Sequence, residues 1–256
     1  MEIKCGDFVT RNSYNNDTIF KVINIQKEVY YLKGVEVRLF ADAFLSDLEK
    51  VEYKQSDDNV ELDLEIPMER DDYFYLIPKI MHFDGDKEYL KRCLDFYKKS
   101  GVVAVGKAVK ESELAGKIIG YLNEYHPDIV IITGHDAYYS KKGSVDDLNN
   151  YRNSLNFVKA VKNARKYEKS HEKLVIIAGA CQSNYEEIIK SGANYASSPK
   201  RINIHALDPA IIAVTIALTE KSKEINLLEM LEKTKYGKDG MGGLKSNGMM
   251  YVGYPR

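Results

Sequence analysis

The chain has 256 residues and a formal net charge of −1, from 37 basic and 38 acidic side chains. This balance excludes a global basic surface for nucleic acid, and no apolar run approaches the roughly 20 residues that span a bilayer. The polar start of the chain lacks the pattern of a signal peptide, so we expect a cytoplasmic protein without a membrane anchor. Three widely spaced cysteines, Cys5, Cys93 and Cys181, indicate neither a disulfide framework nor a cysteine-ligated zinc site.

The first part of the chain, residues 1–56, is typical of a small β domain. Short runs of β-branched and aromatic residues alternate with Asn, Asp and Gly turns, and the runs lie at 7–10, 19–25, 29–32 and 35–40. Residues 43–51 predict a short closing turn or helix. We therefore predict an SH3-like β-barrel over 1–56. Residues 57–72 are acidic and poor in large apolar groups, and we predict a linker there.

From residue 73 to residue 256 the pattern changes to alternating strands and helices. Apolar runs predict strands at 73–81, 102–105, 129–133, 174–178 and 194–197. Helical patterns lie at 87–99, 111–124, 147–167, 185–190, 209–218 and 227–235. Nearly continuous apolar strands that are separated by helices predict an α/β domain, with a mostly parallel sheet covered by helices on both faces.

Two of the predicted strands end in residues suited to catalysis. One strand runs into Gly134-His135-Asp136, and the next runs into Gly179-Ala180-Cys181. Because the carboxyl ends of parallel strands meet at one edge of a sheet, His135 and Cys181 are predicted to lie on the same rim. A nearby His can take the proton of a thiol, and the thiolate is the nucleophile. The backbone N–H groups of Asp136 and Cys181, in turns that contain glycine, are candidates for an oxyanion hole.

Simpler interpretations of these residues stay open. A free Cys is often only a small buried apolar group, and a His after a strand is often structural. Asp84 and Asp86 follow another strand, where they could bind a cation or a basic side chain, or cap a helix. The polar segment 197–208 after the fifth strand could form a pocket wall, with Ser197 and Asp208 at its ends and His205 as the rival base.

Several longer segments resemble the YabG family, the sporulation-specific proteases of spore-forming bacteria. They are residues 6–14, 32–43, 82–86, 133–136, 147–154, 178–183 and 196–209. The resemblance implies a cysteine endopeptidase that processes spore coat and cortex-related proteins in the mother cell, in association with the forming coat. It also implies cleavage near basic residues, particularly Arg.

A looser similarity concerns the predicted rim. Caspase-like and gingipain-like cysteine proteases place a His after one strand and a Cys after the next, in that chain order. Their His is usually followed by Gly, where this chain has Asp136, and clostripain-type relatives carry an acid where this chain has Gly179. The similarity thus implies the Cys–His dyad, on a caspase-like domain, but it does not identify the acid that would select Arg. The candidates for that acid are Asp84, Asp86, Asp136 and Asp208.

The hypothesis is therefore that Cys181 attacks the scissile carbonyl and that His135 carries the proton, with no metal or organic cofactor. One alternative is a Cys-dependent amidase or an amidotransferase-like hydrolase. Another is a noncatalytic scaffold of the spore coat that docks through its barrel. The barrel could equally recruit substrates, tether the enzyme or cover the active site.

Overall fold

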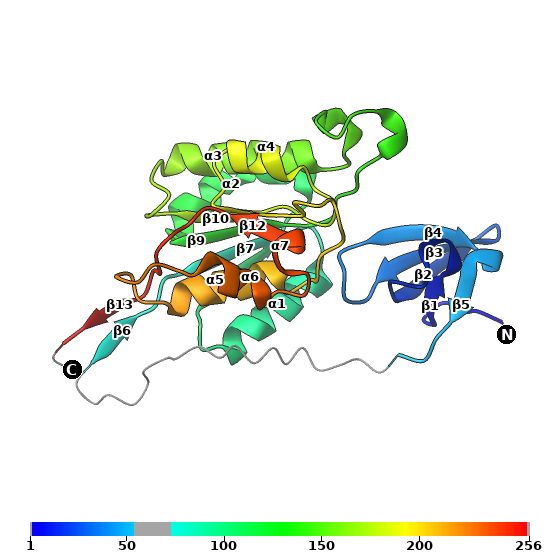
Figure 1. The fold of residues 1–256 in the computed structure, drawn as a ribbon, viewed down its shortest axis with the longest axis horizontal. Helices are drawn as coiled ribbons and strands as arrows, with labels where there is room; N and C mark the ends of the chain where they lie inside the picture. The colour runs from blue at the N-terminus through cyan, green and yellow to red at the C-terminus, as the bar shows by residue number, and fades with distance from the viewer. Residues whose placement is uncertain (1, 54–72, 255–256) are drawn as a thin grey trace. The chain divides into compact units, whose positions relative to one another are not determined.

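The computed structural model describes residues 2–53 and 73–254 (Figure 1). The chain divides into two compact units, Met1–Asn59 and Val60–Arg256, and each is described here by itself. The predicted linker, residues 57–72, lies outside the described residues, and so does the predicted boundary at residue 56.

The N-terminal unit contains a five-stranded antiparallel sheet in the order β4-β3-β2-β1-β5. Its elements are β1 (Phe8–Arg11), η1 (Asn12–Tyr14), β2 (Phe20–Gln26), β3 (Val29–Gly34), β4 (Phe40–Phe44), η2 (Leu45–Asp47) and β5 (Leu48–Lys50). Apolar side chains on one face, including Val9, Phe20, Val22 and Leu32, form its core. The antiparallel β character was predicted, whereas closure into an SH3-like barrel stays a prediction.

One predicted strand of this unit, at 35–40, is misplaced. The backbone N–H of Gly34 donates to the carbonyl of Leu39 at 2.7 Å, and the N–H of Leu39 donates to the carbonyl of Val37 at 2.9 Å. These bonds close a tight turn, so the chain becomes a strand again only at Phe40. The β-branched composition of the segment therefore gave the wrong prediction, because local hydrogen bonds override propensity.

The second unit is built on a six-stranded sheet in the order β12-β11-β10-β9-β7-β8. Its strands are β7 (Ile80–Asp84), β8 (Ala104–Ala108), β9 (Ile129–Thr133), β10 (Val175–Ala178), β11 (Tyr195–Ser197) and β12 (Met241–Gly243). The first five are parallel, and β12 runs antiparallel to β11. The prediction of a mostly parallel sheet is confirmed. The strand β12 has no apolar β-branched signal and was not predicted.

Helices cover both faces of this sheet (Figure 1). One face carries α2 (Glu111–Tyr125), α3 (Ser154–Tyr167) and α4 (Tyr185–Lys190). The other carries α1 (Lys87–Lys99), α5 (Asp208–Leu218), α6 (Leu227–Glu232) and the short α7 (Gly237–Gly240). Every residue of α5 is buried. Among the described residues, no helix is long and apolar enough to cross a membrane.

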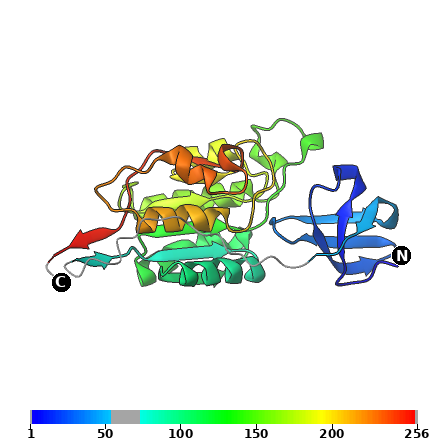
Figure 2. The same cartoon turned by 60° about the horizontal axis from the view of Figure 1, so that its bottom comes forward.

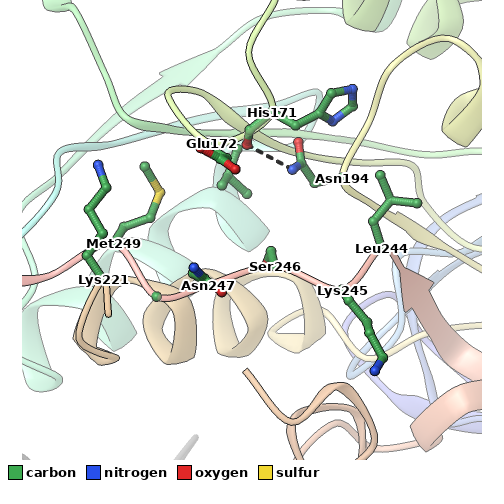
Figure 3. A pocket seen from close by; sticks show the side chains of 11 residues that line it. His171, Glu172, Asn194, Lys221, Leu244, Lys245, Ser246, Asn247 and Met249 are labelled. Carbon is green, nitrogen blue, oxygen red and sulfur yellow. Dashed lines mark hydrogen bonds between the residues drawn. The ribbon is translucent and has the colours of Figure 1, made fainter. Parts of the chain in front are cut away.

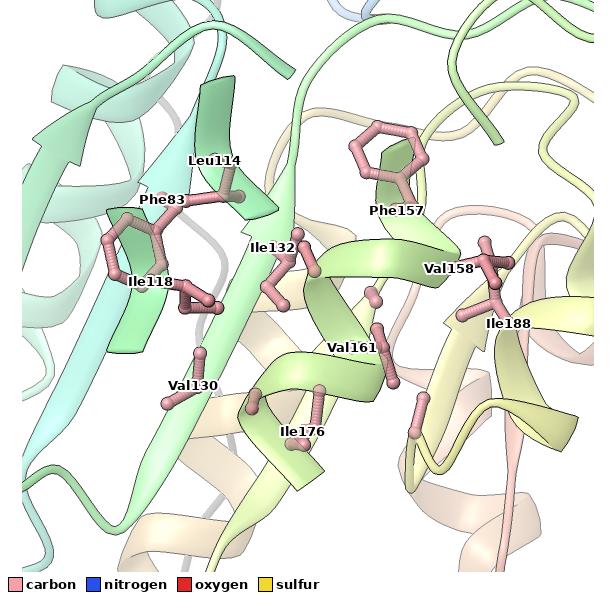
Figure 4. Packing of buried hydrophobic residues seen from close by; sticks show 14 of the residues in the cluster. Phe83, Leu114, Ile118, Val130, Ile132, Phe157, Val158, Val161, Ile176 and Ile188 are labelled. Atoms are coloured by element: carbon pink, nitrogen blue, oxygen red, sulfur yellow. The ribbon is translucent and has the colours of Figure 1, made fainter. Parts of the chain in front are cut away.

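The core between the sheet and the first helical layer explains why these elements form. Figure 4 shows Ile118 of α2 and Val161 of α3 packed over Val130, Ile132 and Ile176 of the sheet. Burying one such side chain stabilises the fold by about 1.5–3 kcal/mol. This packing fixes β9 against β10, and so it also fixes the distance between the turns that follow them.

Two predicted elements are interrupted in the structure. The predicted strand 73–81 is two strands, β6 (Phe74–Leu76) and β7, because Pro78 between them has no N–H for a ladder. The strand β6 pairs with β13 (Tyr251–Gly253) in a separate ribbon beside the main sheet (Figures 1 and 2). The predicted helix 147–167 is a 3-10 turn, η4 (Leu148–Asn150), followed by α3, and another 3-10 turn, η3 (Ser140–Lys142), precedes both.

Candidate functional site

The candidate site lies at the carboxyl edge of the parallel strands. His135 follows β9 and Cys181 follows β10, and these strands are hydrogen-bonded neighbours in which Ile132 pairs with Ala178. Asp84 ends β7, on the other side of β9. The topology therefore brings the three predicted catalytic or acidic segments to one edge of the sheet, which is the placement that the dyad hypothesis requires.

His135 is held by contacts to its ring and to its backbone. Its Nε2 lies 3.3 Å from Asp86 Oδ2, at the start of α1. Its backbone N–H donates to Glu111 Oε1 at 2.7 Å, at the start of α2, and its carbonyl accepts from Asn153 Nδ2 at 2.7 Å. The ring of Tyr89 stands edge-on at 5.8 Å. The imidazole is thus nearly buried and has a defined orientation.

Cys181 is fully buried against the segment that follows β11. Its Sγ accepts from the backbone N–H of Ile204 at 3.3 Å, and its thiol donates to the carbonyl of Ile204 at 3.7 Å. The next residue, Gln182, has a φ of 58° and donates its N–H to the carbonyl of Ile202 at 3.0 Å. The N–H of Ile204 could donate to a thiolate, whereas full burial and the carbonyl acceptor suit the neutral thiol that is present before its proton is removed.

The buried carboxylate of Asp136 connects the His135 turn to the Cys181 turn. Its oxygens accept from Ser154 Oγ at 2.5 Å, Asn153 N at 2.7 Å, Ala137 N at 2.9 Å and Ser183 Oγ at 2.9 Å. The hydroxyl of Ser183 in turn accepts from the N–H of Ala180 at 2.9 Å. Burial raises the pKa of Asp136 above its ordinary value, while these hydrogen bonds oppose the shift.

A second network of buried hydrogen bonds lies at the ends of β7 and β9, next to the turn that carries His135. Thr133 Oγ1 donates to Asp84 Oδ2 at 2.9 Å and lies 2.8 Å from His82 Nε2, and His82 Nδ1 lies 2.8 Å from Tyr97 Oη. Asp84 Oδ1 accepts from the N–H of Asp86 at 2.8 Å. His82, Thr133 and Asp84 are buried. The network holds the end of β7 against the end of β9.

Gly134 permits a close approach that any side chain would block. A Cβ at this position would lie 2.2 Å from Glu111 Oε1, the atom that accepts from the N–H of His135. Gly85 is similarly close to the same carboxylate, at 2.3 Å. The glycines before His135 and before Asp86 therefore make room for the carboxylate of Glu111.

The remaining predicted residues lie on the segment after β11. Ser197 is buried at the end of that strand, and its Oγ has no hydrogen-bond partner within residues 2–53 and 73–254. Asp208 is the first residue of α5; its Oδ2 accepts from the N–H of His205 at 2.9 Å and its Oδ1 from the N–H of Lys235 at 3.0 Å. Both His205 and Asp208 lie just beyond the contact between Ile204 and Cys181.

The sequence analysis included His82 only within the segment 82–86 and gave it no role of its own, and it did not identify Glu111 or Thr133 as parts of the site. Glu111 is one of many acidic residues at helix starts, and only its spatial position distinguishes it. His82 offered a usable signal, because a polar residue in the middle of a buried apolar strand must find partners. Across the described residues, no group of three or more His, Cys, Asp or Glu side chains could hold a metal ion.

A pocket of about 300 Å³ lies at the opposite edge of the sheet (Figure 3). Val175 and Asn194, which line it, stand at the amino ends of β10 and β11. Asn194 Nδ2 donates to the carbonyl of His171 at 3.1 Å, as Figure 3 shows. The pocket is therefore remote from Cys181 and His135 and is not part of the candidate site.

Comparison with known proteins identifies a family of peptidases. The family model of YabG peptidase U57 matches residues 4–67 and 62–255. The sporulation-specific protease YabG of Bacillus subtilis (strain 168) is 40% identical over 286 aligned residues, which cover 100% of this chain and 99% of that protein. The receiver domain of a Francisella response regulator is 15% identical, with a TM-score of 0.35, over 55% of this chain and 96% of that one; this likeness is too weak to carry an argument. The family model and the full-length relative together show that the chain belongs to the YabG peptidase family and is a sporulation-specific protease.

Proposed function

We propose that the chain is a cysteine endopeptidase whose nucleophile is Cys181 and whose general base is His135. The observation that carries this proposal is their position on the turns after β9 and β10, two neighbouring parallel strands of a peptidase. In caspase-like proteases, too, a His follows one strand and a Cys follows the next. We therefore propose the same class of mechanism on a caspase-like sheet. We also propose that the N-terminal unit is an SH3-like barrel.

In this mechanism His135 accepts the thiol proton, and the sulfur of Cys181 attacks the carbonyl carbon of the scissile bond. The S–C bond forms, the C–N bond breaks, and His135 gives the proton to the leaving amine. Water then hydrolyses the thioester and releases the acid product. The backbone N–H groups of Cys181 and Asp136, beside Gly134, are the proposed donors to the oxyanion.

We propose that the substrates are spore coat and cortex-related proteins in the mother cell, cleaved at basic sites, particularly Arg. Of the four candidate acids, Asp136 already accepts four hydrogen bonds, Asp86 contacts His135, and Asp84 contacts Thr133. Asp208 is also buried and accepts two hydrogen bonds, but it lies on the segment that touches Cys181, and for that position we propose to test it first as the acid that selects a guanidinium. Ser197, on the same segment, is the proposed neighbouring polar contact.

The test is cleavage of an unstructured protein by the wild type, Cys181→Ala and His135→Ala, with the fragment ends mapped by mass spectrometry. Cleavage after basic residues by the wild type alone is expected. Cleavage that survives Cys181→Ala at the wild-type rate would eliminate the proposed nucleophile. Asp208→Asn tests specificity, because it should lower cleavage after Arg more than it lowers cleavage at other sites.

A further inference from the structure

We propose that Asp86 is the positioning residue of His135. Its carboxylate would hold the imidazole through Nε2 and stabilise the protonated ring. This inference rests on the proposed function and names a further member of the same site. It changes the role of Asp86 from a candidate for substrate binding to a group that acts through the base.

The contact between Asp86 and His135 is close and almost excluded from solvent. Asp86 Oδ2 lies 3.3 Å from His135 Nε2, and the two side chains are 11% and 9% exposed. The other carboxylate oxygen has a separate role, because Oδ1 accepts from the N–H of Glu88 at 2.8 Å and of Tyr89 at 3.3 Å and so caps α1. The backbone N–H of Asp86 is held by Asp84 Oδ1. The direction of the carboxylate is therefore fixed before any substrate binds.

Three groups near His135, namely Glu111, Tyr89 and Asp136, make contacts of other kinds. Glu111 accepts from the backbone N–H of His135, and Tyr89 presents a ring edge. The carboxylate of Asp136 accepts from Ser154 and Ser183 instead. Asp86 thus supplies a carboxylate that contacts the ring itself. In a Cys–His pair the attacking form is the thiolate with an imidazolium, and a carboxylate beside the imidazolium favours that form.

The helix cap offers a competing explanation for Asp86, and one substitution separates the two. Asn caps a helix about as well as Asp, so Asp86→Asn should keep α1 intact while it removes the negative charge beside His135. Glu88→Gln is the matched control. It removes one negative charge from the same helix turn, at an exposed position, and leaves the contact with His135 in place.

The experiment measures kcat, KM and the pH–rate profile of the full chain on a peptide with one Arg, together with thermal unfolding. For Asp86→Asn we expect kcat to fall about 10- to 100-fold, with KM changed less than about twofold, as for the loss of a charge-assisted hydrogen bond. The alkaline limb of the profile should move to lower pH, because the carboxylate that favours the imidazolium is removed. The Tm should stay within about 2 °C of the wild type, and Glu88→Gln should match the wild type throughout.

Three results would overturn the proposal in distinguishable ways. If Cys181→Ala is inactive but Asp86→Asn has the kcat and the pH profile of the wild type, Asp86 is only a helix cap and the cysteine-protease assignment stands. If activity survives Cys181→Ala, the proposed nucleophile and the role of Asp86 are both wrong. A fall in kcat with an unshifted alkaline limb would also reject charge stabilisation of the imidazolium.

Discussion

Replacing Gly134 by Ala should uncouple Glu111 from the turn that carries His135. The added Cβ would lie 2.2 Å from Glu111 Oε1 and 2.8 Å from its Cδ, so the carboxylate must move away. The N–H of His135 then loses its acceptor, which is 2.7 Å away in the native fold. A hydrogen bond to a charged group contributes about 1.5–3 kcal/mol. For a chain of this size that loss corresponds to a fall in Tm of roughly 3–12 °C.

The assay combines thermal unfolding with kcat/KM for peptide cleavage. Gly120→Ala is the control, because Gly120 lies inside α2 and an added Cβ there meets no atom within 4 Å. That substitution should stabilise the protein by about 0.5–1 kcal/mol, since Ala is the better helix former. The two Gly-to-Ala changes are thus expected to move the Tm in opposite directions.

A double-mutant cycle tests whether the carboxylate of Glu111 is what makes glycine necessary at position 134. Glu111→Ala removes the acceptor and also the atoms that Gly134→Ala would strike. In the Glu111→Ala background, Gly134→Ala should therefore cost less than about 0.5 kcal/mol, because the interaction it breaks is already gone. Equal costs of Gly134→Ala in both backgrounds would show that the glycine is needed for some reason other than the carboxylate of Glu111.

Two further predictions concern the buried carboxylates. The folded-state pKa of Asp136 is raised by burial above its ordinary value of 3.8, so the folded protein binds a proton more readily than the unfolded chain. Wild type should therefore lose stability relative to Asp136→Asn as pH rises from about 4 through the folded pKa, and urea unfolding across pH 4–7 measures this; a pH-independent difference would contradict it. Thr133→Val keeps the side-chain shape but removes the hydroxyl between His82 and Asp84. It should cost about 2–5 kcal/mol in urea unfolding, because two buried polar groups lose a partner, whereas a cost near zero would mean that water replaces the hydroxyl.

The sequence predicted the sheet well where burial dominates. Residues 129–133 and 174–178 are continuous apolar runs, and a strand buried on both faces can have no other pattern. The positions of His135 and Cys181 on the turns after these strands were predicted for the same reason, since both residues follow the end of such a run. The strand β12 was invisible because Met241-Gly242-Gly243 has little β propensity; a Cβ at Gly243 would lie 2.3 Å from the ring of Tyr195, so this edge strand requires glycine.

The supporting residues of the site could not be derived from local patterns. Glu111 and His135 are 24 positions apart, and Asp86 and His135 are 49 apart. Their contacts depend on how α1 and α2 are placed over the sheet, which no short window of sequence encodes. Likewise, the four hydrogen bonds that occupy Asp136 come from side chains and turns on three different segments.

The burial of α5 has a consequence for how the enzyme is made. The segment that contacts Cys181 through Ile204 runs directly into this helix, which is buried along its whole length under one face of the sheet. On the ribosome, β7, β9 and β10 emerge before α5 does, and β12 follows later still. The turn that carries the nucleophile can therefore reach its final shape only near the end of synthesis, and we expect the nascent chain to have no proteolytic activity until then.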